Sequence, residues 1–466
     1  MKMTRRETLL AGSSLLAFPH TVLAQGSPVT LEPRTGSARL ASDGVPETPI
    51  WGYGGKVPGP EIRVMQGQQV SATLSNGLAQ PTTVHWHGIR INNAMDGVTA
   101  LTQDAVQPGQ KFDYRFTAPD AGTFWYHPHN RTWEQMARGL YGPLIVEEKN
   151  PPAYDRDLIL MLDDWRLNDK GAIDEASFGS LHDWSHSGRL GNWRTVNGRP
   201  QPAYPVRQNE RIRFRLINAA NASVMVLRLE GMDARIVAYD GMPIIPQKLT
   251  YTVTLAPAQR VDIIADITDA TKAGLVLTGR ESFEACSFPV EGMARAAPLT
   301  DPVSLPPNPL NTRLDLANAV RATLTIQGGA MSDLTEARIG GFGARYRGEP
   351  EAKGLFPIRS LAGSQGLVWA MNGVAGMPTE PFFSVKAGQT VVVRIVNEGS
   401  WPHAMHFHGH HFRETGNGSP WRDTVLLTRN RMKEIAFVAD NPGRWMLHCH
   451  MLEHQAGGMA TWFEIT

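Results

Sequence analysis

Residues 385–397 read VKAGQTVVVRIVN, a turn followed by a continuous run of β-forming residues that ends in asparagine. The same Val-to-Asn spacing occurs in VMQGQQVSATLSN at residues 64–76 and in VRQNERIRFRLIN at residues 206–218. A turn before a run of alternating or continuous β-formers is typical of a strand in a β-sandwich. Three copies of the pattern therefore predict three related β-sandwich units.

A second recurring element and two proline-rich stretches divide the chain. QPGQKFD at residues 107–113 resembles APAQRVD at residues 256–262. Linkers are expected at Asn150–Pro152 and in the proline-rich stretch 302–309, so the predicted units span 28–150, 151–310 and 311–466. Residues 332–364 are rich in glycine and lack clear periodicity, and we expect them to form a long loop or a weak helix of the third unit.

The first 24 residues have the features of a bacterial twin-arginine export signal. Arg5 and Arg6 precede a short apolar stretch from Leu9 to Phe18, and Val22-Leu23-Ala24 offers a small-residue cleavage site. The apolar stretch is too short to cross a membrane as a permanent helix. We therefore expect export by the twin-arginine machinery, a periplasmic or secreted mature chain, and no permanent membrane span.

Composition narrows the possible functions. The formal net charge is +1 and there is no basic run, so we expect no nucleic-acid partner. The length allows two to four domains. The chain has two cysteines, Cys286 and Cys449, and if the second is a metal ligand the first has no partner, so we expect no disulfide.

Ten of the fifteen histidines fall in four short clusters. These clusters are His85-Trp86-His87, His127-Pro128-His129, the segment from His403 to His408, and His448-Cys449-His450 followed by His454. Alternate side chains of a strand face the same side of a sheet, so a His-x-His pair can bind one metal or two adjacent metals. The clusters therefore predict a metal-binding protein.

The histidine clusters of the first and third units correspond to each other. Gly122 precedes His127 by the same distance as Gly443 precedes His448, and Cys449 occupies a position that a proline holds in the first unit. Eight imidazoles from two related sandwiches are therefore expected to converge where those sandwiches meet. The middle unit has no such pair, which indicates a spacer.

The last cluster adds sulfur to the imidazoles. A thiolate from Cys449, two imidazoles and the thioether of Met459 are the ligand set of a blue-copper electron-transfer site. His448 and His450 must face the opposite side of a strand from the cysteine between them. One segment is thus expected to join two copper sites, whereas zinc would be expected to recruit several cysteines or carboxylates.

These motifs resemble those of the multicopper oxidases, the family of laccases, cuprous oxidases and bilirubin oxidases, over nearly the whole mature chain. The resemblance implies an all-β chain of three consecutive cupredoxin-like Greek-key β-sandwich domains that bind four copper ions. It assigns the ligands as follows: His403, Cys449, His454 and Met459 to type 1 copper; His85 and His406 to type 2 copper; His87, His127, His129, His408, His448 and His450 to the type 3 pair.

The reaction that the resemblance implies has two halves. Type 1 copper removes one electron at a time from a phenol, an aromatic amine or a metal ion, and four electrons reduce O2 to water at the trinuclear cluster. The electrons pass through Cys449 to His448 and His450, which we therefore class as catalytic. The methionine at position 459 resembles the axial ligand of lower-potential members.

Proton delivery to O2 requires acids near the cluster. Asp96 matches the family's acidic residue near the type 2 site, and a turn-forming Asp-Gly is its alternative role. Many bacterial members place an acid directly after the last type 1 histidine; here Gln455 stands there, and Glu453 is a nearby candidate. Asp423 is expected in a turn, with a position beside the substrate as the alternative.

The leading hypothesis is a monomeric laccase-like oxidase. A periplasmic oxidase of Cu(I) or Fe(II) in copper tolerance is an alternative, although the third unit lacks a methionine-rich insert. A non-catalytic cupredoxin scaffold or copper-storage protein is the alternative of a different class, and it predicts missing ligands, of which there are none. His182 and His186 are expected to be solvated loop residues of the second unit, with a metal-binding pair on a helix turn as the alternative.

Overall fold

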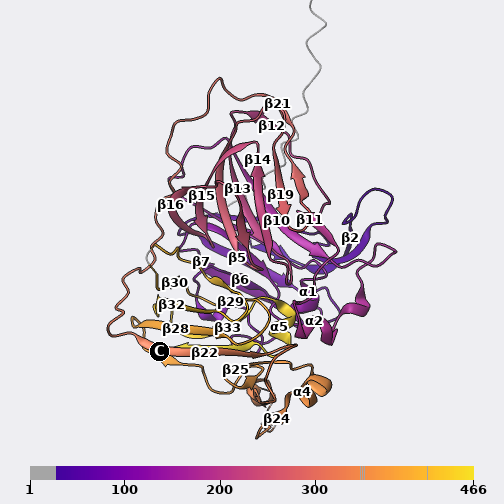
Figure 1. Cartoon of the computed structure of the whole chain (residues 1–466), viewed down its shortest axis with the longest axis vertical. Coiled ribbons are helices and arrows are strands. Elements are labelled where there is room, and N and C mark those ends of the chain that lie inside the picture. Colours follow the sequence, from indigo (N-terminus) through magenta and orange to yellow (C-terminus); the bar gives the residue numbers. More distant parts are fainter. Residues whose placement is uncertain (1–27, 347, 349, 351, 417) are drawn as a thin grey trace, which may run out of the picture.

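The computed structural model describes residues 28–466 except 347, 349, 351 and 417, so the predicted export signal lies outside the described residues. Three consecutive β-sandwiches form the molecule, with the second at the top of Figure 1, the third at the bottom and the first between them. The predicted all-β, three-sandwich class is confirmed. No described helix is long and apolar enough to cross a membrane.

The first sandwich has a three-stranded and a four-stranded sheet, and a separate hairpin that follows the first strand. The three-stranded sheet contains β1 (Val29–Leu31), β5 (Gln69–Ser75) and β7 (Lys111–Thr117). The four-stranded sheet contains β4 (Ile62–Met65), β9 (Gly142–Glu147), β8 (Gly122–His127) and β6 (His85–His87). The hairpin is β2 (Pro33–Ala38) and β3 (Thr48–Tyr53).

The second sandwich has a six-stranded and a four-stranded sheet, with an additional strand pair. The larger sheet contains β11 (Trp193–Val196), β10 (Arg156–Trp165), β13 (Arg211–Asn218), β18 (Arg260–Ile267), β15 (Met232–Tyr239) and β16 (Met242–Lys248). The smaller sheet contains β17 (Val253–Leu255), β14 (Met225–Glu230), β19 (Gly274–Thr278) and β20 (Phe283–Ser287). The pair is β12 (Val206–Gln208) and β21 (Val290–Met293).

The third sandwich has an eight-stranded and a five-stranded sheet. The first contains β24 (Phe356–Pro357), β23 (Glu336–Ile339), β26 (Val374–Ala375), β25 (Trp369–Met371), β22 (Val320–Gly328), β28 (Thr390–Asn397), β32 (Met432–Val438) and β30 (Arg413–Glu414). The second contains β27 (Ser384–Val385), β34 (Ala460–Ile465), β33 (Gly443–Cys449), β29 (His403–Phe407) and β31 (Thr424–Leu427).

The described helices are short. The α-helices are α1 (Thr132–Gln135), α2 (Leu181–Ser185), α3 (Phe342–Tyr346), α4 (Ile358–Gln365) and α5 (Leu452–Ala456), and the 3-10 helices are η1 (Asn93–Met95) and η2 (Glu175–Ser177). Residues 332–364, expected as a long loop or weak helix, contain β23, α3, β24 and most of α4, so that expectation is only partly right.

Residues 64–76, 206–218 and 385–397 have the same local structure. In each, a turn residue with positive φ precedes the strand, namely Gly67, Asn209 or Gly388, at 86°, 59° and 88°. The asparagine that ends each stretch uses its side-chain oxygen to accept the backbone amide two residues on, and its side-chain nitrogen to donate to two backbone carbonyls. The asparagine therefore fixes the chain reversal after each strand, because it satisfies three buried backbone groups.

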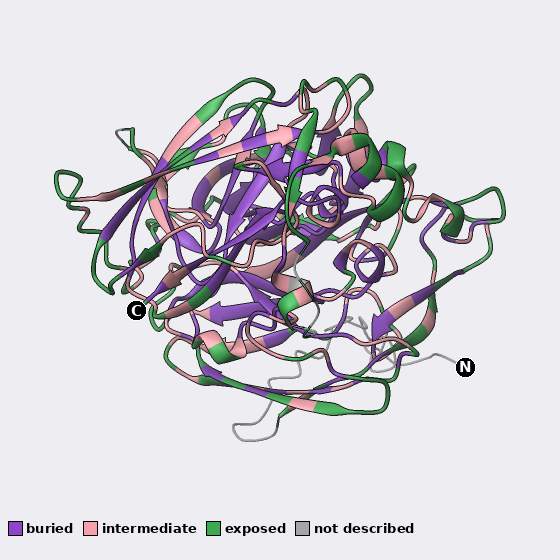
Figure 2. Ribbon diagram, turned by 90° about the horizontal axis from the view of Figure 1, so that it is seen from below, coloured by how far each residue is buried: buried purple, intermediate pink, exposed green. Residues whose placement is uncertain are grey.

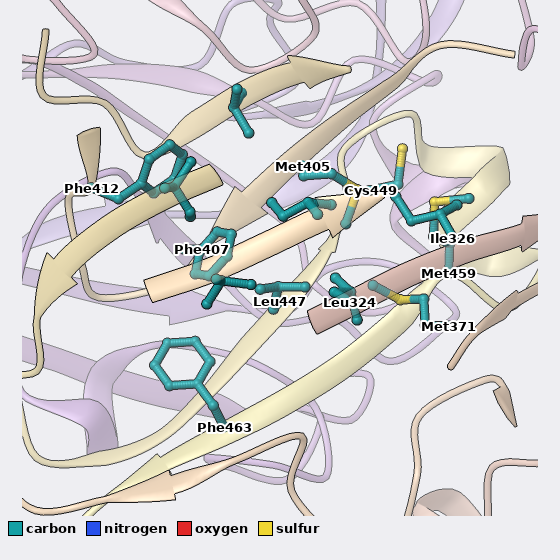
Figure 3. Close-up of a cluster of buried hydrophobic side chains, with 14 of the residues drawn as sticks. Leu324, Ile326, Met371, Met405, Phe407, Phe412, Leu447, Cys449, Met459 and Phe463 are labelled. Carbon is teal, nitrogen blue, oxygen red and sulfur yellow. The ribbon is translucent and has the colours of Figure 1, made fainter. Parts of the chain in front are cut away.

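Each sandwich has its own apolar core. Figure 2 shows that buried residues follow the strands and that exposed residues gather in the loops. The core of the third sandwich includes Phe407, Leu447 and Phe463, and it extends to Cys449 and Met459 (Figure 3). Cys286 is a free, buried thiol in the core of the second sandwich.

A buried group of charges joins the first sandwich to the second. Arg213 on β13 donates to both oxygens of Glu148, which follows β9, at 2.8 Å each, and to Asp262 on β18 at 2.6 Å. Burial opposes ionisation of Glu148, but the hydrogen bonds and charge of Arg213 hold the pKa of this carboxyl below its usual value. A buried charge that loses its partner is strongly destabilising, so this group fixes how the two sandwiches meet.

Replacing Glu148 by Gln is expected to lower the stability of the protein at pH 7 by about 3 kcal/mol, because the buried Arg213 loses one of its two hydrogen-bonded carboxylates. The carboxylate has a lowered pKa when folded, so its contribution is present at neutral pH and is lost as the pH falls through the folded pKa. Urea midpoints of wild type and variant, measured from pH 7 down to pH 3, should therefore converge at the acid end. A constant difference over this range would contradict the assignment.

Candidate metal centre

Strand pairing brings the histidine clusters together in the same way in two sandwiches. β6 pairs with β8 so that His85 lies opposite His127, and β29 pairs with β33 so that His406 lies opposite His448. β8 and β33 both begin at a glycine with positive φ. A Cβ atom at Gly122 would lie 2.4 Å from a backbone oxygen of the second sandwich, so only glycine permits this close approach.

Eight imidazole rings converge between the first and third sandwiches. The Nε2 atoms of His408 and His448 lie 3.1 Å apart, and those of His127 and His450 lie 3.3 Å apart. Nitrogen atoms of three sets lie within 4.8 Å of one another: His85 with His406 and His408, His85 with His87 and His127, and His129 with His408 and His448. All eight rings are buried, with at most 5 % of each residue exposed.

Several rings are held by their outward nitrogens. The Nδ1 atoms of His127 and His448 are 2.9 Å from the backbone oxygens of Pro128 and Cys449, and the Nδ1 of His85 is 2.8 Å from that of Asp96. A carbonyl oxygen can only accept, so each of these Nδ1 atoms carries the proton and Nε2 keeps its lone pair. The lone pairs therefore point into the shared space.

This arrangement fits metal ions. Burial, with neighbouring histidines adding to its effect, holds the pKa values of His127, His129, His448 and His450 well below the usual value, so these rings are neutral. The buried Nε2 atoms of His85, His129 and His406 have no hydrogen-bond partner among the described residues. Buried polar atoms are normally paired, and imidazole nitrogens with free lone pairs suit copper.

A smaller group lies on the other side of β33. Cys449 Sγ is 3.8 Å from the Nδ1 atoms of His403 and of His454, which are 3.1 Å apart. Met459 is fully buried, and its backbone bonds to Cys449 and to His454. Burial raises the pKa of the Cys449 thiol to about 12, so a cation is needed to hold it as a thiolate at neutral pH. The predicted sulfur and nitrogen ligands thus come together in one place.

Two carboxylates support the eight-histidine cluster. Asp96 Oδ2 accepts a hydrogen bond from His408 Nδ1 at 2.9 Å, and its other oxygen is 3.2 Å from His85 Nδ1. Asp423 Oδ1 lies 3.3 Å from His87 Nε2, and its backbone oxygen is 3.0 Å from His406 Nδ1. Such contacts orient metal-binding rings.

Asp423 lies at a bend directly before β31, and its side chain also has a role that the sequence did not indicate. It is fully buried and binds Arg260 of the second sandwich through two contacts of 2.7 and 3.0 Å. Burial opposes ionisation of Asp423, but the Arg260 charge holds the pKa of this carboxyl well below its usual range. The ion pair joins residues 163 positions apart, so no local motif indicates it.

The middle sandwich is therefore more than the spacer that the missing histidine pairs indicated. It supplies Arg260, and it also forms most of a cleft of about 290 Å³ beside the cysteine site. The cleft is lined by Arg194, Ser223, Met225 and Leu277 of the second sandwich and by Pro402 and Met451 of the third. Pro402 precedes His403, and the Met451 amide donates to Cys449 Sγ.

Helix α2 of the middle sandwich covers the cysteine site. The Nε2 of His454, which is fully buried, donates to the backbone oxygen of His186 at 2.7 Å. His186 directly follows α2, and His182 lies within it, so the expectation that both are solvated holds only for His182, which is exposed.

The proton-delivery candidates lie in different places. Glu453 is buried, accepts a hydrogen bond from Asn221 at 2.9 Å, and has a pKa that burial raises above its usual value. It faces the second sandwich. The side-chain oxygen of Gln455, the residue in place of an acid, is buried without a partner among the described residues.

Comparison with known proteins agrees with this geometry. Three family profiles described as multicopper oxidase match residues 35–151, 156–275 and 355–466. The chain belongs to the multicopper oxidase family. The family predicted from the sequence is thus confirmed, and the chain is an oxidoreductase that uses O2 and a reducing substrate.

Relatives of this multicopper oxidase align over most of their lengths. It is 32 % identical to multicopper oxidase MmcO of Mycobacterium tuberculosis, with 88 % of this chain and 82 % of the relative covered. Laccase-1 of Botryotinia fuckeliana is 28 % identical, with 93 % and 82 % covered. The crystal structure of Lac15 from a marine microbial metagenome is 39 % identical with a TM-score of 0.75, covering 94 % of this chain and all of that one.

Replacing Arg260 by Met is expected to lower copper affinity and oxidase activity by about 10–100-fold, because Asp423 would lose the charge that fixes it against His87 and His406. Copper content per chain, measured by elemental analysis, checks the first effect. Arg228→Met, at a half-exposed arginine of the same sandwich, is the control and should keep full copper content. Full copper content in both variants would show that Arg260 has no positioning role.

Proposed function

We propose that this multicopper oxidase is a laccase-like enzyme that oxidises phenols or aromatic amines in the cleft beside Cys449. The position of the cleft carries the proposal, because its walls include Pro402 and Met451, the neighbours of the predicted type 1 ligands. Leu277 and Met225 give it apolar walls, and its volume of about 290 Å³ suits a small aromatic molecule. The similarity to Laccase-1 supports this substrate class.

The proposal includes four copper ions per chain with the ligands predicted from the sequence. His403, Cys449, His454 and Met459 would hold type 1 copper, His85 and His406 would hold type 2 copper, and the type 3 pair would take the six remaining histidines of the cluster, His87, His127, His129, His408, His448 and His450. When bound, copper supplies one-electron chemistry at the thiolate site and four-electron reduction of O2 to two waters at the three-ion cluster. The converging unprotonated nitrogens support this assignment.

The chain itself connects the two sites. Cys449 lies between His448 and His450, so each histidine is joined to it by a short covalent path. The backbone oxygen of Cys449 also accepts a hydrogen bond from His448 Nδ1 at 2.9 Å, which adds a second, shorter path from the cysteine to one ring. In this proposal, electrons pass from the thiolate site through Cys449 to His448 and His450 of the histidine cluster.

A carboxylate beside the cleft can take the proton that a phenol loses when it is oxidised. Ser223 lines the cleft and donates to Asp164 Oδ2 at 2.5 Å, so its hydroxyl oxygen is free to accept a hydrogen bond from a phenol. Burial raises the pKa of Asp164 above its usual value, which makes this carboxylate a better proton acceptor. The phenol loses one electron and one proton, and the proton passes through Ser223 to Asp164.

Further parts of the proposal rest on the sequence. We propose that the twin-arginine machinery exports the protein to the periplasm or out of the cell. We also propose that the chain is a monomer with domains at residues 28–150, 151–310 and 311–466. Asp96 is proposed to take part in proton transfer at the cluster, and its contact with His408 supports that role.

Cys449→Ser is expected to abolish the blue copper–thiolate absorption and O2 consumption together, because the variant lacks both the thiolate ligand and the electron route. Cys286→Ser is the matched control, since this second cysteine is buried in the core of the middle sandwich. The control should keep the colour and the turnover. Turnover that persists in Cys449→Ser would refute the route.

Asp164→Asn is expected to lower kcat for phenols by about 100-fold, at the low end of the range for loss of a general base. Ferrocyanide releases no proton on oxidation, so its turnover should change little. The ratio of the two rates is the measurement, and Asp169→Asn, at an exposed carboxylate, is the control. An equal loss with both reductants would assign Asp164 a structural role only.

A further inference from the structure

The cleft that we propose for the phenol continues into a second space, which we call the outer cleft. The outer cleft has a volume of about 320 Å³ and shares three lining residues with the first cleft, namely Arg194, Leu277 and Thr278. Its other walls include Arg280, Glu281 and Phe283. Because the two spaces share a wall and each is close to the size of a small-molecule site, one elongated substrate can occupy both.

The outer cleft lies between the edges of the two sheets of the second sandwich. Arg194 is on β11, the edge strand of the six-stranded sheet, and Phe283 is on β20, the edge strand of the four-stranded sheet. β11 and β20 contact each other, and Arg280 lies in the short connection between β19 and β20. Both arginines are therefore held on or beside paired strands.

The charged side chains of the outer cleft favour an anion. Arg194 and Arg280 are exposed, and neither side chain forms an ion pair or a hydrogen bond with another described residue. Their guanidinium groups therefore keep free donors, whose planar geometry matches a carboxylate. Glu281 is the acidic residue among those that line the outer cleft, so two positive charges are set against one negative charge.

The proton acceptor and the arginines lie in different parts of the joined space. Ser223, which bonds to Asp164, lines the first cleft alone, whereas Arg280 lines the outer cleft alone, and Arg194 lines both. A phenol whose hydroxyl group meets Ser223 can therefore extend a side chain past Arg194 toward Arg280. Leu277, which also lines both spaces, gives the ring and the side chain an apolar wall.

We propose that the joined clefts select phenols that carry a carboxylate on a side chain, such as hydroxycinnamates, and that Arg194 and Arg280 bind this carboxylate. The inference rests on the proposed function and narrows its substrate class. The phenol still loses one electron to the thiolate site and its hydroxyl proton to Ser223 and Asp164. The carboxylate is unchanged by the reaction and serves only to hold the substrate.

Cinnamate tests the binding step without turnover, because it has the carboxylate but no hydroxyl group to oxidise. Titration calorimetry of the copper-loaded enzyme is expected to show that cinnamate binds about 10-fold more tightly than its neutral methyl ester, as one charge-assisted hydrogen bond at an exposed site would give. Arg194→Gln and Arg280→Gln should each remove most of this difference. Arg199→Gln, at an exposed arginine that lines neither cleft, is the control and should preserve it.

Turnover tests whether the arginines select the substrate. The measurement is the ratio of kcat/KM for a hydroxycinnamate to kcat/KM for its methyl ester. Arg194 lies opposite Asp164 in the β10–β11 pair, so its replacement also affects proton transfer, but the ratio cancels effects that the two substrates share. The ratio is expected to fall about 10-fold in Arg194→Gln, to rise in Glu281→Gln because a repelling charge is lost, and to stay constant in Arg199→Gln.

Three results would overturn the inference. Equal cinnamate affinity in wild type, Arg194→Gln and Arg280→Gln would refute the carboxylate site. Lost cinnamate affinity with an unchanged turnover ratio would refute its role in substrate selection. A wild-type enzyme that oxidises neither the hydroxycinnamate nor its ester would refute the proposed function and the selection with it, whereas the cinnamate titration would still decide whether the carboxylate site exists.

Discussion

The structure depends on the close approach of unprotonated imidazole nitrogens from buried histidines of two sandwiches. The Nε2 lone pairs of His408 and His448 lie 3.1 Å apart, and they repel each other unless they bind a cation. Metal binding therefore stabilises the docking of the first sandwich on the third, and the two are thermodynamically coupled. Gly443 at the start of β33 allows the close approach, since a Cβ atom there would lie 2.5 Å from the Asn93 side chain of the first sandwich. The carboxylates of Asp96 and Asp423 set how the rings are turned.

The middle sandwich contributes no histidine to the cluster, yet it determines the surroundings of both sites. Arg260 reaches from it to neutralise Asp423, and the Arg213 group fixes its position on the first sandwich. Its strands and loops also form most of the cleft, and its residue His186 covers His454. The two ligand-bearing sandwiches therefore depend on a third that keeps the β-sandwich pattern and carries different side chains at the interface.

The fold and the gathered histidines could be predicted from the sequence because both are encoded in short, repeated spacings. The Val-to-Asn pattern predicts the strands that end at Asn76, Asn218 and Asn397, and His-x-His pairs on strands must share a face. The Arg260–Asp423 pair could not be predicted, because it depends on how separate sandwiches dock. The cleft likewise depends on docking, because its walls come from two sandwiches, and the cap over His454 follows a five-residue helix that is too short to show periodicity.

The predicted copper ligands and most of the cleft lining come from different sandwiches, and this separation affects how the substrate specificity of such an enzyme can change. The predicted copper ligands lie in the first and third sandwiches, whereas the cleft that we propose for the reductant is lined largely by residues of the second. On that proposal, mutations of the cleft residues change which molecule is recognised and leave the copper ligands in place. Substrate specificity could therefore evolve through substitutions in the second sandwich, while the sandwiches that reduce O2 stay unchanged.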